Sequence, residues 1–517
     1  MDDLRHDPEL LGRLRDDLAG AEYTVAGVEE RLGPLAVAAL HREEAVPALR
    51  ATDRSGTDPS GPDPCRTLVR AFVLGRAVAR RALDAALPTV GTAGAARLGL
   101  AVAAGADPDD EVRAAVDLRP YTASDQGGSV DWWIASDLGE LATGRSLRTD
   151  HVLGVGGAST TLAQVTVRTP RRRVLDLGTG CGIQALHATR HAEAVVGTDI
   201  SGRALEFARF NALLAGESHR IGLRLGSMLA PVAGELFDLV VSNPPFVITP
   251  RSPGVPAYEY RDGGRAGDAI VEELVTGVGA VLAPGGVAQL LGNWEVRRGE
   301  DWHERVGEWL DRSGLDGWVV QREWQDPAQY AETWIRDGGT TPERDRAAWE
   351  HQYAAWLDDF ESRDVEGVGF GIVTLRRPVT GAPTLRRLEE LTGTVHQPLG
   401  ATIATSLAAH DWLEARDDAA LGAERLTVAG DVTEERYLTP GASDPSVVLL
   451  RQGGGFGRAV RAGTALAGFV GACDGSLTVG SLVDALGDVL GVPASDVAAD
   501  VLPSVRGLVE DGLLLVV

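Results

Sequence analysis

The chain of 517 residues is predicted to be an α/β protein built around a parallel, doubly wound sheet. Three observations predict this fold. From about residue 170 to Pro378, short apolar strands alternate with helical segments. A glycine-rich turn directly follows the first of these strands, and an Asn-Pro-Pro-Phe motif directly follows the fourth. Ligands bind at the carboxyl ends of strands in open parallel sheets, so both motifs fall where a functional site is expected.

The composition limits the class of protein. Hydrophobic residues make up 44% of the chain, which is enough for packed cores, and the length suggests about three domains. No apolar run reaches the roughly 18 residues of a membrane span and no signal pattern opens the chain, so we expect a cytoplasmic protein without membrane contact. A formal net charge of −25 disfavours a broad surface for nucleic acid phosphates. All 49 basic residues are arginines, which leaves no lysine for catalysis.

The cysteines and the flanking regions say less about chemistry. Cys65, Cys181 and Cys473 are too few and too far apart for a disulfide framework or a metal site, so we predict no metal.

Residues 1–110 have apolar residues at helical spacing, with a loop rich in Ser, Gly, Asp and Pro at 53–64, and predict a helical, winged-helix-like module. Residues 379–517 predict an α+β module whose end, a periodic helix before a strand at 512–517, also resembles a winged helix.

The central domain is predicted at 111–378, with its core beginning at about 170. Its seven strands are expected at 174–177, 194–198, 221–225, 237–242, 286–292, 317–321 and 369–375. The connection before the last strand is about 45 residues long, which predicts an insertion at about 325–365 with helices at 327–336 and 344–359. Eight of the eleven tryptophans lie between Trp294 and Trp356. We favour amphipathic helices packed on the sheet over the alternative, an aromatic lid above the site.

The glycine-rich turn runs from Asp176 to Gly182 and opens a helix. Glycines let the backbone approach a ligand closely, and the helix N-terminus offers free N–H groups. The spacing is G-x-G-x-G, which differs from the G-x-G-x-x-G of dinucleotide sites. The next strand ends at Asp199, whose carboxylate is suited to accept hydrogen bonds from ribose hydroxyls. Together these elements predict a site for a nucleoside cofactor.

The motif Asn243-Pro244-Pro245-Phe246 predicts a rigid clamp for the acceptor. Two prolines fix the backbone and supply no N–H, which leaves the Asn243 side-chain oxygen and the Pro244 carbonyl as fixed hydrogen-bond acceptors. A planar nitrogen is a poor nucleophile because its lone pair is delocalised. Two such acceptors would hold the nitrogen with its lone-pair face toward the methyl donor, and Phe246 would stack on the planar group. Positioning of this kind contributes about 7 to 11 kcal/mol in favourable cases.

On these residues the region of about 150–300 resembles the class I S-adenosylmethionine-dependent methyltransferases, which have a Rossmann-like, seven-stranded core. Asn243 to Phe246 resembles the signature of the amino-methyltransferases. The longer stretches 243–250 and 258–268 most resemble the release factor glutamine N5-methyltransferases, in which a Gly-Gly segment shapes the acceptor side. The resemblance implies a catalytic group of Asn243, Pro244, Pro245 and Phe246. It implies a cofactor-binding group of Asp176, Gly178, Thr179, Gly180, Gly182, Asp199, Ile200, Gly226, Ser227 and Asn243. Ser227 departs from the pattern, because many relatives carry Asp there.

The leading hypothesis is therefore an enzyme that transfers methyl from S-adenosylmethionine to a planar nitrogen, with a protein glutamine side chain as the favoured acceptor. Two alternatives stay open. One is an RNA or DNA base amino-methyltransferase that uses a terminal module to dock nucleic acid. The other is a non-catalytic binding protein with a relic methyltransferase core. The sequence predicts no oligomeric state.

Overall fold

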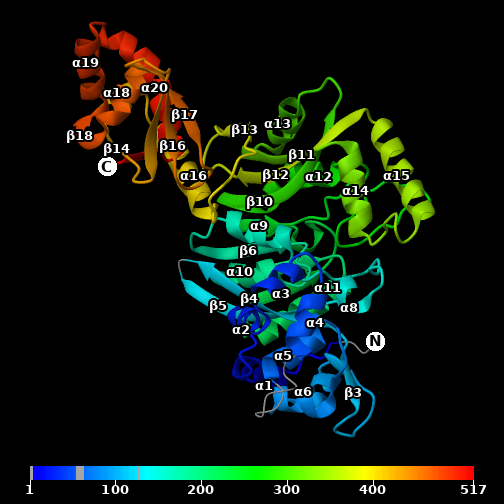
Figure 1. Cartoon of the computed structure of the whole chain (residues 1–517). Helices are drawn as coiled ribbons and strands as arrows, with labels where there is room; N and C mark the ends of the chain where they lie inside the picture. The colour runs from blue at the N-terminus through cyan, green and yellow to red at the C-terminus, as the bar shows by residue number, and fades with distance from the viewer. Residues whose placement is uncertain (1–3, 54–62, 126) are drawn as a thin grey trace. The chain divides into compact units, whose positions relative to one another are not determined.

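The computed structural model describes residues 4–53, 63–125 and 127–517, so most of the loop predicted at 53–64 lies outside the described residues. The chain divides into two compact units (Figure 1). The first comprises Met1–Ala163 and Pro170–Pro383, and the second comprises Gln164–Thr169 and Thr384–Val517. Residues 1–110, predicted as a separate module, thus belong to the same unit as the central sheet.

Seven strands of the first unit lie in one sheet, in the order β11-β12-β10-β9-β6-β7-β8. Its strands are β6 Arg171–Leu177, β7 Ala192–Asp199, β8 Ile221–Leu225, β9 Phe237–Ser242, β10 Leu282–Arg297, β11 Asp316–Gln325 and β12 Val365–Arg376. The strands β6 to β10 run parallel, whereas β12 runs antiparallel between β10 and β11. The predicted α/β fold with a parallel-rich central sheet is confirmed.

Two details of the sheet differ from the prediction. The sheet is mixed, because β12 returns antiparallel to both of its neighbours. The strand β10 continues to Arg297, five residues beyond its predicted end, because it pairs with β12 along that whole length. The longer β10 therefore reaches past the end of β9, where the acceptor motif begins.

The helices of the sheet follow its strands. They are α10 Ile183–Thr189, α11 Gly202–Leu214, α12 Ala269–Gly277 and α13 Trp302–Ser313. The predicted insertion between β11 and β12 is present as α14 Pro327–Asp337 and α15 Arg346–Glu361. Asp326 and Asp345 begin these two helices, since each side chain accepts a hydrogen bond from a backbone N–H of the first turn.

The N-terminal residues share a core with the sheet. They form α1 Pro8–Gly20, α2 Val25–Leu32, α3 Pro34–Leu40, α4 Val46–Asp53, α5 Pro64–Leu68, α6 Arg80–Ala86 and α7 Gly91–Arg97, a small sheet of β1 Val78–Ala79, β2 Ala101–Ala103 and β3 Glu111–Ala114, and the paired strands β4 Asp117–Asp125 and β5 Gly128–Ser136. One hydrophobic cluster joins Leu11 and Leu14 of α1 to Phe207 and Phe210 of α11. The helices α8 Glu140–Thr143 and α9 Gly157–Val165 lead into β6.

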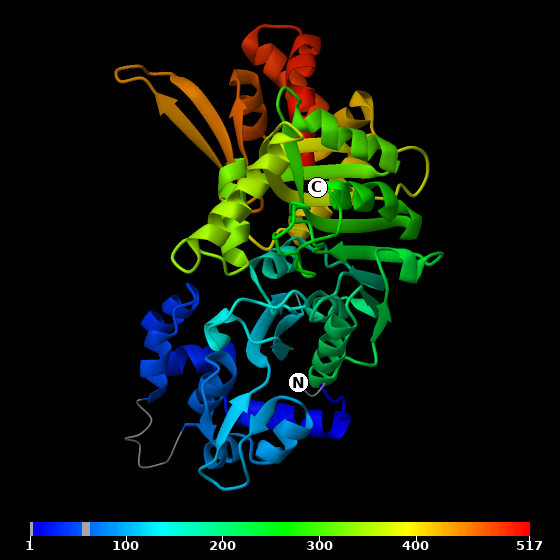
Figure 2. The ribbon, with the colours of Figure 1, turned by 90° about the vertical axis from the view of Figure 1, so that its right-hand side faces the viewer.

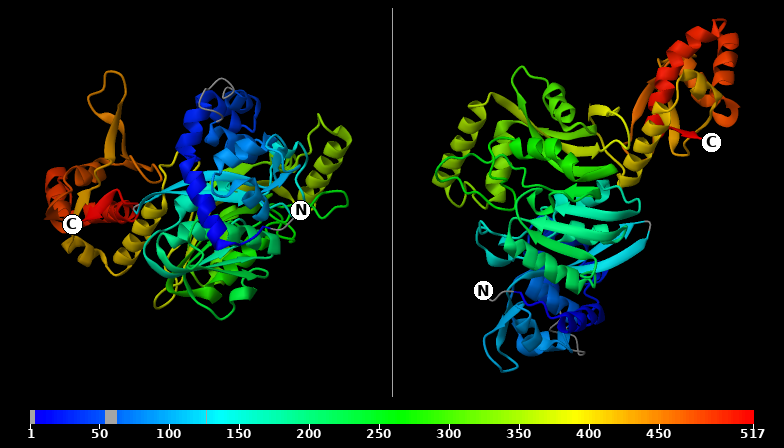
Figure 3. Two further views of the ribbon diagram at one scale, coloured as in Figure 1. Left: turned by 90° about the horizontal axis from the view of Figure 1, so that it is seen from below. Right: turned by 180° about the vertical axis from the view of Figure 1, so that it is seen from behind.

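The second unit contains two small sheets and several helices. Its elements are β13 Arg386–Glu390, α16 Gly400–Glu414, α17 Asp418–Ala423, β14 Arg425–Val428, β15 Val432–Leu438, β16 Pro445–Gln452, β17 Ala459–Ala462, α18 Thr464–Gly471, β18 Asp474–Thr478, α19 Val479–Leu490, α20 Ala494–Glu510 and β19 Leu514–Val516. The strands β15 and β16 form a long ribbon that extends away from the helices of this unit (Figures 2 and 3). The winged-helix likeness of the two terminal regions stays a prediction. Among the described residues, no helix is both long and apolar enough to cross a membrane.

Candidate active site

The glycine-rich turn connects β6 to α10 and adopts the conformation that its glycines permit. Gly178, Gly180 and Gly182 have φ angles of 74°, 55° and 87°, which side-chain-bearing residues rarely adopt. A Cβ added to Gly178 or Gly180 would meet no atom within 4 Å, whereas one added to Gly182 would lie 3.1 Å from Cα of Ala208 on α11. The first two glycines therefore border open space, and the third permits close packing of two helices.

Asp176 supports this turn from the protein interior. Its buried carboxylate accepts hydrogen bonds from the Thr179 hydroxyl at 2.5 Å and from the backbone N–H of Ala185 at 2.9 Å. Burial raises the pKa of Asp176 to about 7. Asp176 and Thr179 thus hold the turn and the start of α10 in place.

A second set of predicted residues gathers where β7 and β8 end. The Asp199 carboxylate accepts hydrogen bonds from the N–H groups of Gly180 at 2.9 Å and Ser201 at 2.8 Å, and burial raises its pKa. Ile200 is 66% exposed. The Gly226 N–H donates to the Asp199 carbonyl at 2.9 Å, and Ser227, which follows Gly226, is exposed. The sequence analysis overlooked Leu225, the last residue of β8, which is 64% exposed.

The acceptor motif begins beside the glycine-rich turn. In the parallel pairing of β6 and β9, Leu177 lies opposite Ser242, and the Ser242 hydroxyl donates to the Leu177 carbonyl at 2.8 Å. Gly178 and Asn243 are the next residues on the two strands. The two predicted ligand-binding segments therefore leave the sheet at adjacent positions.

The two hydrogen-bond acceptors predicted in the motif differ in whether they already have a partner. The Asn243 Oδ1 atom is buried and has no hydrogen-bond partner among the described residues. The Pro244 carbonyl accepts the N–H of Phe246 at 2.7 Å, which occupies one of its two lone pairs. Phe246 packs against an apolar cluster that contains Tyr330 and Trp356 of the inserted helices.

The segment that follows the motif folds back against it, as the sequence suggested for residues 258–268. The Val247 N–H donates to the Arg261 carbonyl at 2.8 Å, and Phe246 forms an isolated bridge with Asp262. A Cβ on Gly263 would lie 3.0 Å from the Pro245 carbonyl oxygen and 2.2 Å from Cδ1 of Ile270, so a larger residue there would force its neighbours to shift.

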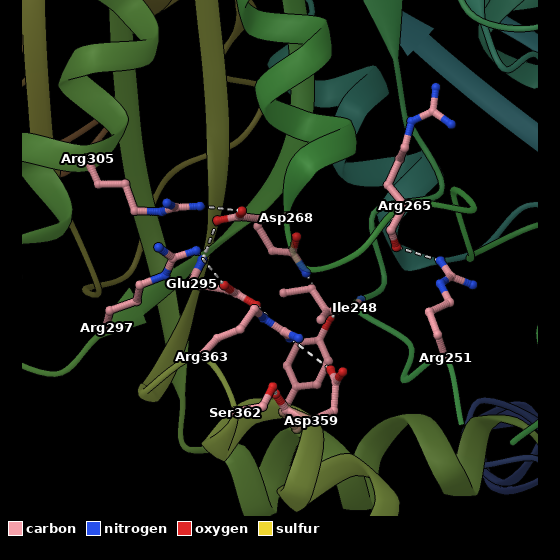
Figure 4. Close-up of polar contacts among 12 residues, drawn as sticks. Ile248, Arg251, Arg265, Asp268, Glu295, Arg297, Arg305, Asp359, Ser362 and Arg363 are labelled. Carbon is pink, nitrogen blue, oxygen red and sulfur yellow. Dashed lines mark hydrogen bonds and ion pairs between the residues drawn. The ribbon is translucent and has the colours of Figure 1, made fainter. Parts of the chain in front are cut away.

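A buried ionic network fixes the end of this segment (Figure 4). Asp268 accepts hydrogen bonds from Arg305 at 2.5 Å and from the Glu295 N–H at 2.8 Å. Arg363 bridges the carboxylates of Glu295 and Asp359, each at 2.8 Å. Burial raises the pKa of Glu295, and the Asp268 charge adds to this. The network joins α12, α13, β10 and α15 at the acceptor side of the sheet.

The tryptophans mostly pack inside the first unit. Trp294, Trp302, Trp309, Trp318 and Trp356 are buried, and Trp324 is 45% exposed. This arrangement agrees with packing against the sheet, which the sequence favoured over a lid. The described residues contain no group of three or more His, Cys, Asp or Glu arranged to hold a metal ion.

The sequence analysis also missed Asn211, which is fully buried on α11. Its side chain exchanges two hydrogen bonds with the backbone of Ala135 on β5, at 2.8 and 2.9 Å, and donates a third to the Cys181 carbonyl at 2.8 Å. Asn211 therefore connects the N-terminal strands to the glycine-rich turn. A lone Asn in an apolar helical stretch gave no signal of this contact.

Parts of the chain are similar to known proteins. Residues 154–300 match the family described as methyltransferase small domain, and residues 20–115 match one described as a domain of unknown function (DUF7059). The chain is 36% identical over 151 residues to a release factor glutamine methyltransferase of Moorella thermoacetica, covering 28% of this chain and 53% of that protein. It is 32% identical over 157 residues to a ribosomal protein uL3 glutamine methyltransferase of Bradyrhizobium diazoefficiens, covering 28% and 49%. A ribosomal protein L11 methylase from Lactobacillus delbrueckii subsp. bulgaricus has 26% identity and a TM-score of 0.22, covering 31% of this chain and 67% of that structure.

The chain spans about half the length of the curated relatives that it matches. The matches confirm the resemblance to methyltransferases that was stated from the sequence.

Proposed function

We propose that this chain, whose residues 154–300 match a methyltransferase domain, uses S-adenosylmethionine to methylate a planar nitrogen, and that the acceptor is a glutamine side chain of a protein. One observation carries the proposal. The open space over Gly178 and Gly180 begins next to Asn243, whose buried Oδ1 atom has no partner among the described residues. A methyl donor and an amide acceptor would therefore meet between two adjacent strand ends.

The residues around the first strand ends fit S-adenosylmethionine. Gly178 and Gly180 leave room for the ligand where any side chain would project. Asp199 is a carboxylate at the end of β7, suited to accept hydrogen bonds from ribose hydroxyls. The exposed Ile200 offers an apolar surface for the adenine ring, and Ser227 lies at the neighbouring strand end. When bound, the cofactor supplies an electrophilic methyl group.

The acceptor motif is suited to orient an amide rather than to deprotonate it. The Asn243 oxygen would accept one N–H of the acceptor, and the second lone pair of the Pro244 carbonyl would accept the other. Phe246 would contact the planar group. The nitrogen would then be held with its lone-pair face toward the methyl group that the cofactor supplies, and its proton would leave to solvent after the transfer. Positioning accounts for the catalytic effect in this scheme.

The choice of a protein glutamine rests on two supports. Residues 154–300, which contain the motif, match a methyltransferase domain, and the two relatives named above are glutamine methyltransferases. The formal charge of −25 disfavours the alternative acceptor, a nucleic acid.

Isothermal titration with S-adenosylhomocysteine tests the cofactor assignment. Asp199→Ala should weaken binding about 10- to 100-fold, because a hydrogen bond to a charged group is worth about 1.5 to 3 kcal/mol. Glu193→Ala, which removes an exposed carboxylate from the same strand, is the matched control and should leave binding unchanged. Absence of binding to the unaltered chain at micromolar concentration would refute the assignment.

The acceptor is tested by incubating the chain with methyl-labelled cofactor and a cell lysate, which is then separated into protein, RNA and small-molecule fractions. Label should enter the protein fraction, and acid hydrolysis should release it as methylamine, because the N5-methylamide bond is cleaved. Label that enters RNA, or that remains on a base after hydrolysis, would refute glutamine as the acceptor.

A further inference from the structure

A tyrosine hydroxyl lies at the centre of the aromatic cluster beside the acceptor motif. Tyr330 of the inserted helix α14 is fully buried, and its ring lies 5.5 to 6.0 Å from those of Trp334, Trp356, Phe360 and Phe370. The hydroxyl accepts the N–H of Ile248 at 3.0 Å. It also accepts a hydrogen bond from the side-chain Nδ2 of Asn293 at 2.8 Å. A helix inserted after β11 is thus tied to both the acceptor segment and β10.

The Asn293 side chain is only half satisfied. It is fully buried, and its Oδ1 atom has no hydrogen-bond partner among the described residues. In the parallel pairing of β10 with β9, Leu290 lies opposite Ser242. Continuing this register puts Leu291 beside Asn243, and Asn293 lies two residues farther along the same face of the strand. Two buried amide oxygens without partners among the described residues therefore come from the adjacent strands β9 and β10, Asn243 just after the end of β9 and Asn293 within β10.

An unpaired amide at this position is costly unless something binds it. A buried polar group without a partner costs about 1 to 3 kcal/mol, whereas an apolar side chain of similar size would fit among these aromatic rings without that cost. The Tyr330 hydroxyl accepts a hydrogen bond from the Asn293 amide and so holds it in one orientation. A phenylalanine would fill the same space without this contact. This is the arrangement expected of a group that is held ready for a ligand.

We infer that Asn293 is a specificity-determining residue of the acceptor site, oriented by Tyr330, and that its free oxygen accepts a hydrogen bond from a second N–H of the acceptor beside the methylated amide. A peptide offers such an N–H in its backbone. The inference rests on the proposed function and extends it, because it makes the inserted helix α14 part of acceptor recognition.

Three variants test the inference: Asn293→Leu, Tyr330→Phe and the double variant. The matched control is Gln321→Leu, which removes another buried amide of the same sheet, one that accepts a hydrogen bond from Trp294. Initial rates of methyl transfer to a dilution series of the lysate protein fraction give apparent kcat and KM. Titration with S-adenosylhomocysteine and thermal melting are measured on the same preparations.

Asn293→Leu should lower apparent kcat/KM at least tenfold, leave the affinity for S-adenosylhomocysteine within twofold, and leave Tm unchanged or raised. Tyr330→Phe should lower kcat/KM as well, and the double variant should be no worse than Asn293→Leu, because Tyr330 acts through Asn293. Gln321→Leu should lower Tm without a selective loss of kcat/KM.

An unchanged kcat/KM in Asn293→Leu would overturn the inference. Methyl transfer by the unaltered chain in the same experiment would still support the proposed function. A loss of kcat/KM in Asn293→Leu that is accompanied by a matching fall in cofactor affinity or in Tm would also overturn the inference. The role of Asn293 would then be structural. If the unaltered chain binds S-adenosylhomocysteine but labels no protein, the proposed acceptor fails and the inference fails with it.

Discussion

Two glycines of the same turn should respond differently to the same substitution. Gly178 and Gly182 have φ angles of 74° and 87°, so Gly178→Ala and Gly182→Ala both place an L-residue in the left-handed region. That conformation costs roughly 1 to 2 kcal/mol in either variant. The backbone cost is therefore matched, and what differs is the space that the new methyl group enters.

The methyl group in Gly178→Ala enters open space, with no atom within 4 Å, whereas in Gly182→Ala it lies 3.1 Å from Cα and Cβ of Ala208. Contact this close between two backbone segments adds roughly 1 to 3 kcal/mol of overpacking. We therefore expect Gly182→Ala to lose about 2 to 5 kcal/mol of stability, and Gly178→Ala about 1 to 2 kcal/mol. If the open space is the cofactor site, Gly178→Ala should also weaken S-adenosylhomocysteine binding at least tenfold, about 1.4 kcal/mol.

Thermal melting without ligand and isothermal titration with S-adenosylhomocysteine separate the two effects. Gly182→Ala should melt at the lower temperature, and Gly178→Ala should bind the ligand more weakly. Equal loss of affinity in both variants would contradict the reasoning, because both would then act through distortion of the turn. An affinity within twofold of the unaltered chain in Gly178→Ala would show that the open space is not the cofactor site.

Three further predictions concern buried polar side chains. Because burial raises the pKa of Asp176 from 3.8 to about 7, the folded chain keeps a proton that the unfolded chain releases, so its stability contribution is lost as pH rises from about 4 to 7. Asp176→Asn should remove this dependence of stability on pH. The Tm of this variant, relative to that of the unaltered chain, should therefore increase between pH 5 and pH 8. Asn211→Leu, which breaks three hydrogen bonds to Ala135 and Cys181, should lower both Tm and the affinity for S-adenosylhomocysteine. Glu295→Gln should cost about 1 to 3 kcal/mol, seen as a lower Tm, because it removes the buried negative charge that pairs with the half-buried Arg297 and Arg363.

Each of these has a result that would contradict it. For Asp176→Asn it is a Tm difference that does not vary with pH. For Asn211→Leu it is normal ligand affinity in a destabilised chain, which would separate the N-terminal contact from the turn. For Glu295→Gln, the variant Glu308→Gln, which changes an exposed carboxylate of α13, serves as control, and equal melting temperatures of the two variants would refute a role for the network.

The sequence predicted the seven strands because each combines an apolar run with a turn signal, and both are local properties. It predicted where the site lies because polar motifs followed strands whose carboxyl ends share one edge. It could not predict that Asp176 would be buried beneath the turn, since burial depends on packing from distant segments. The contacts of Asn211 and Tyr330 join residues 76 and 82 positions apart, and neither residue belongs to a local pattern. The antiparallel course of β12 likewise depends on pairing with two strands that precede it.

The core that α1 shares with α11 makes the N-terminal helices and the central sheet a single cooperative unit. Backbone amides in α1 and α11 should therefore exchange with deuterium through the same opening event, at similar protection and with the same response to denaturant. A fragment limited to residues 154–300 would leave the apolar face of α11 exposed to water and should associate rather than remain monomeric. Asn211 also connects the glycine-rich turn to β5, a strand that ends some forty residues before the turn.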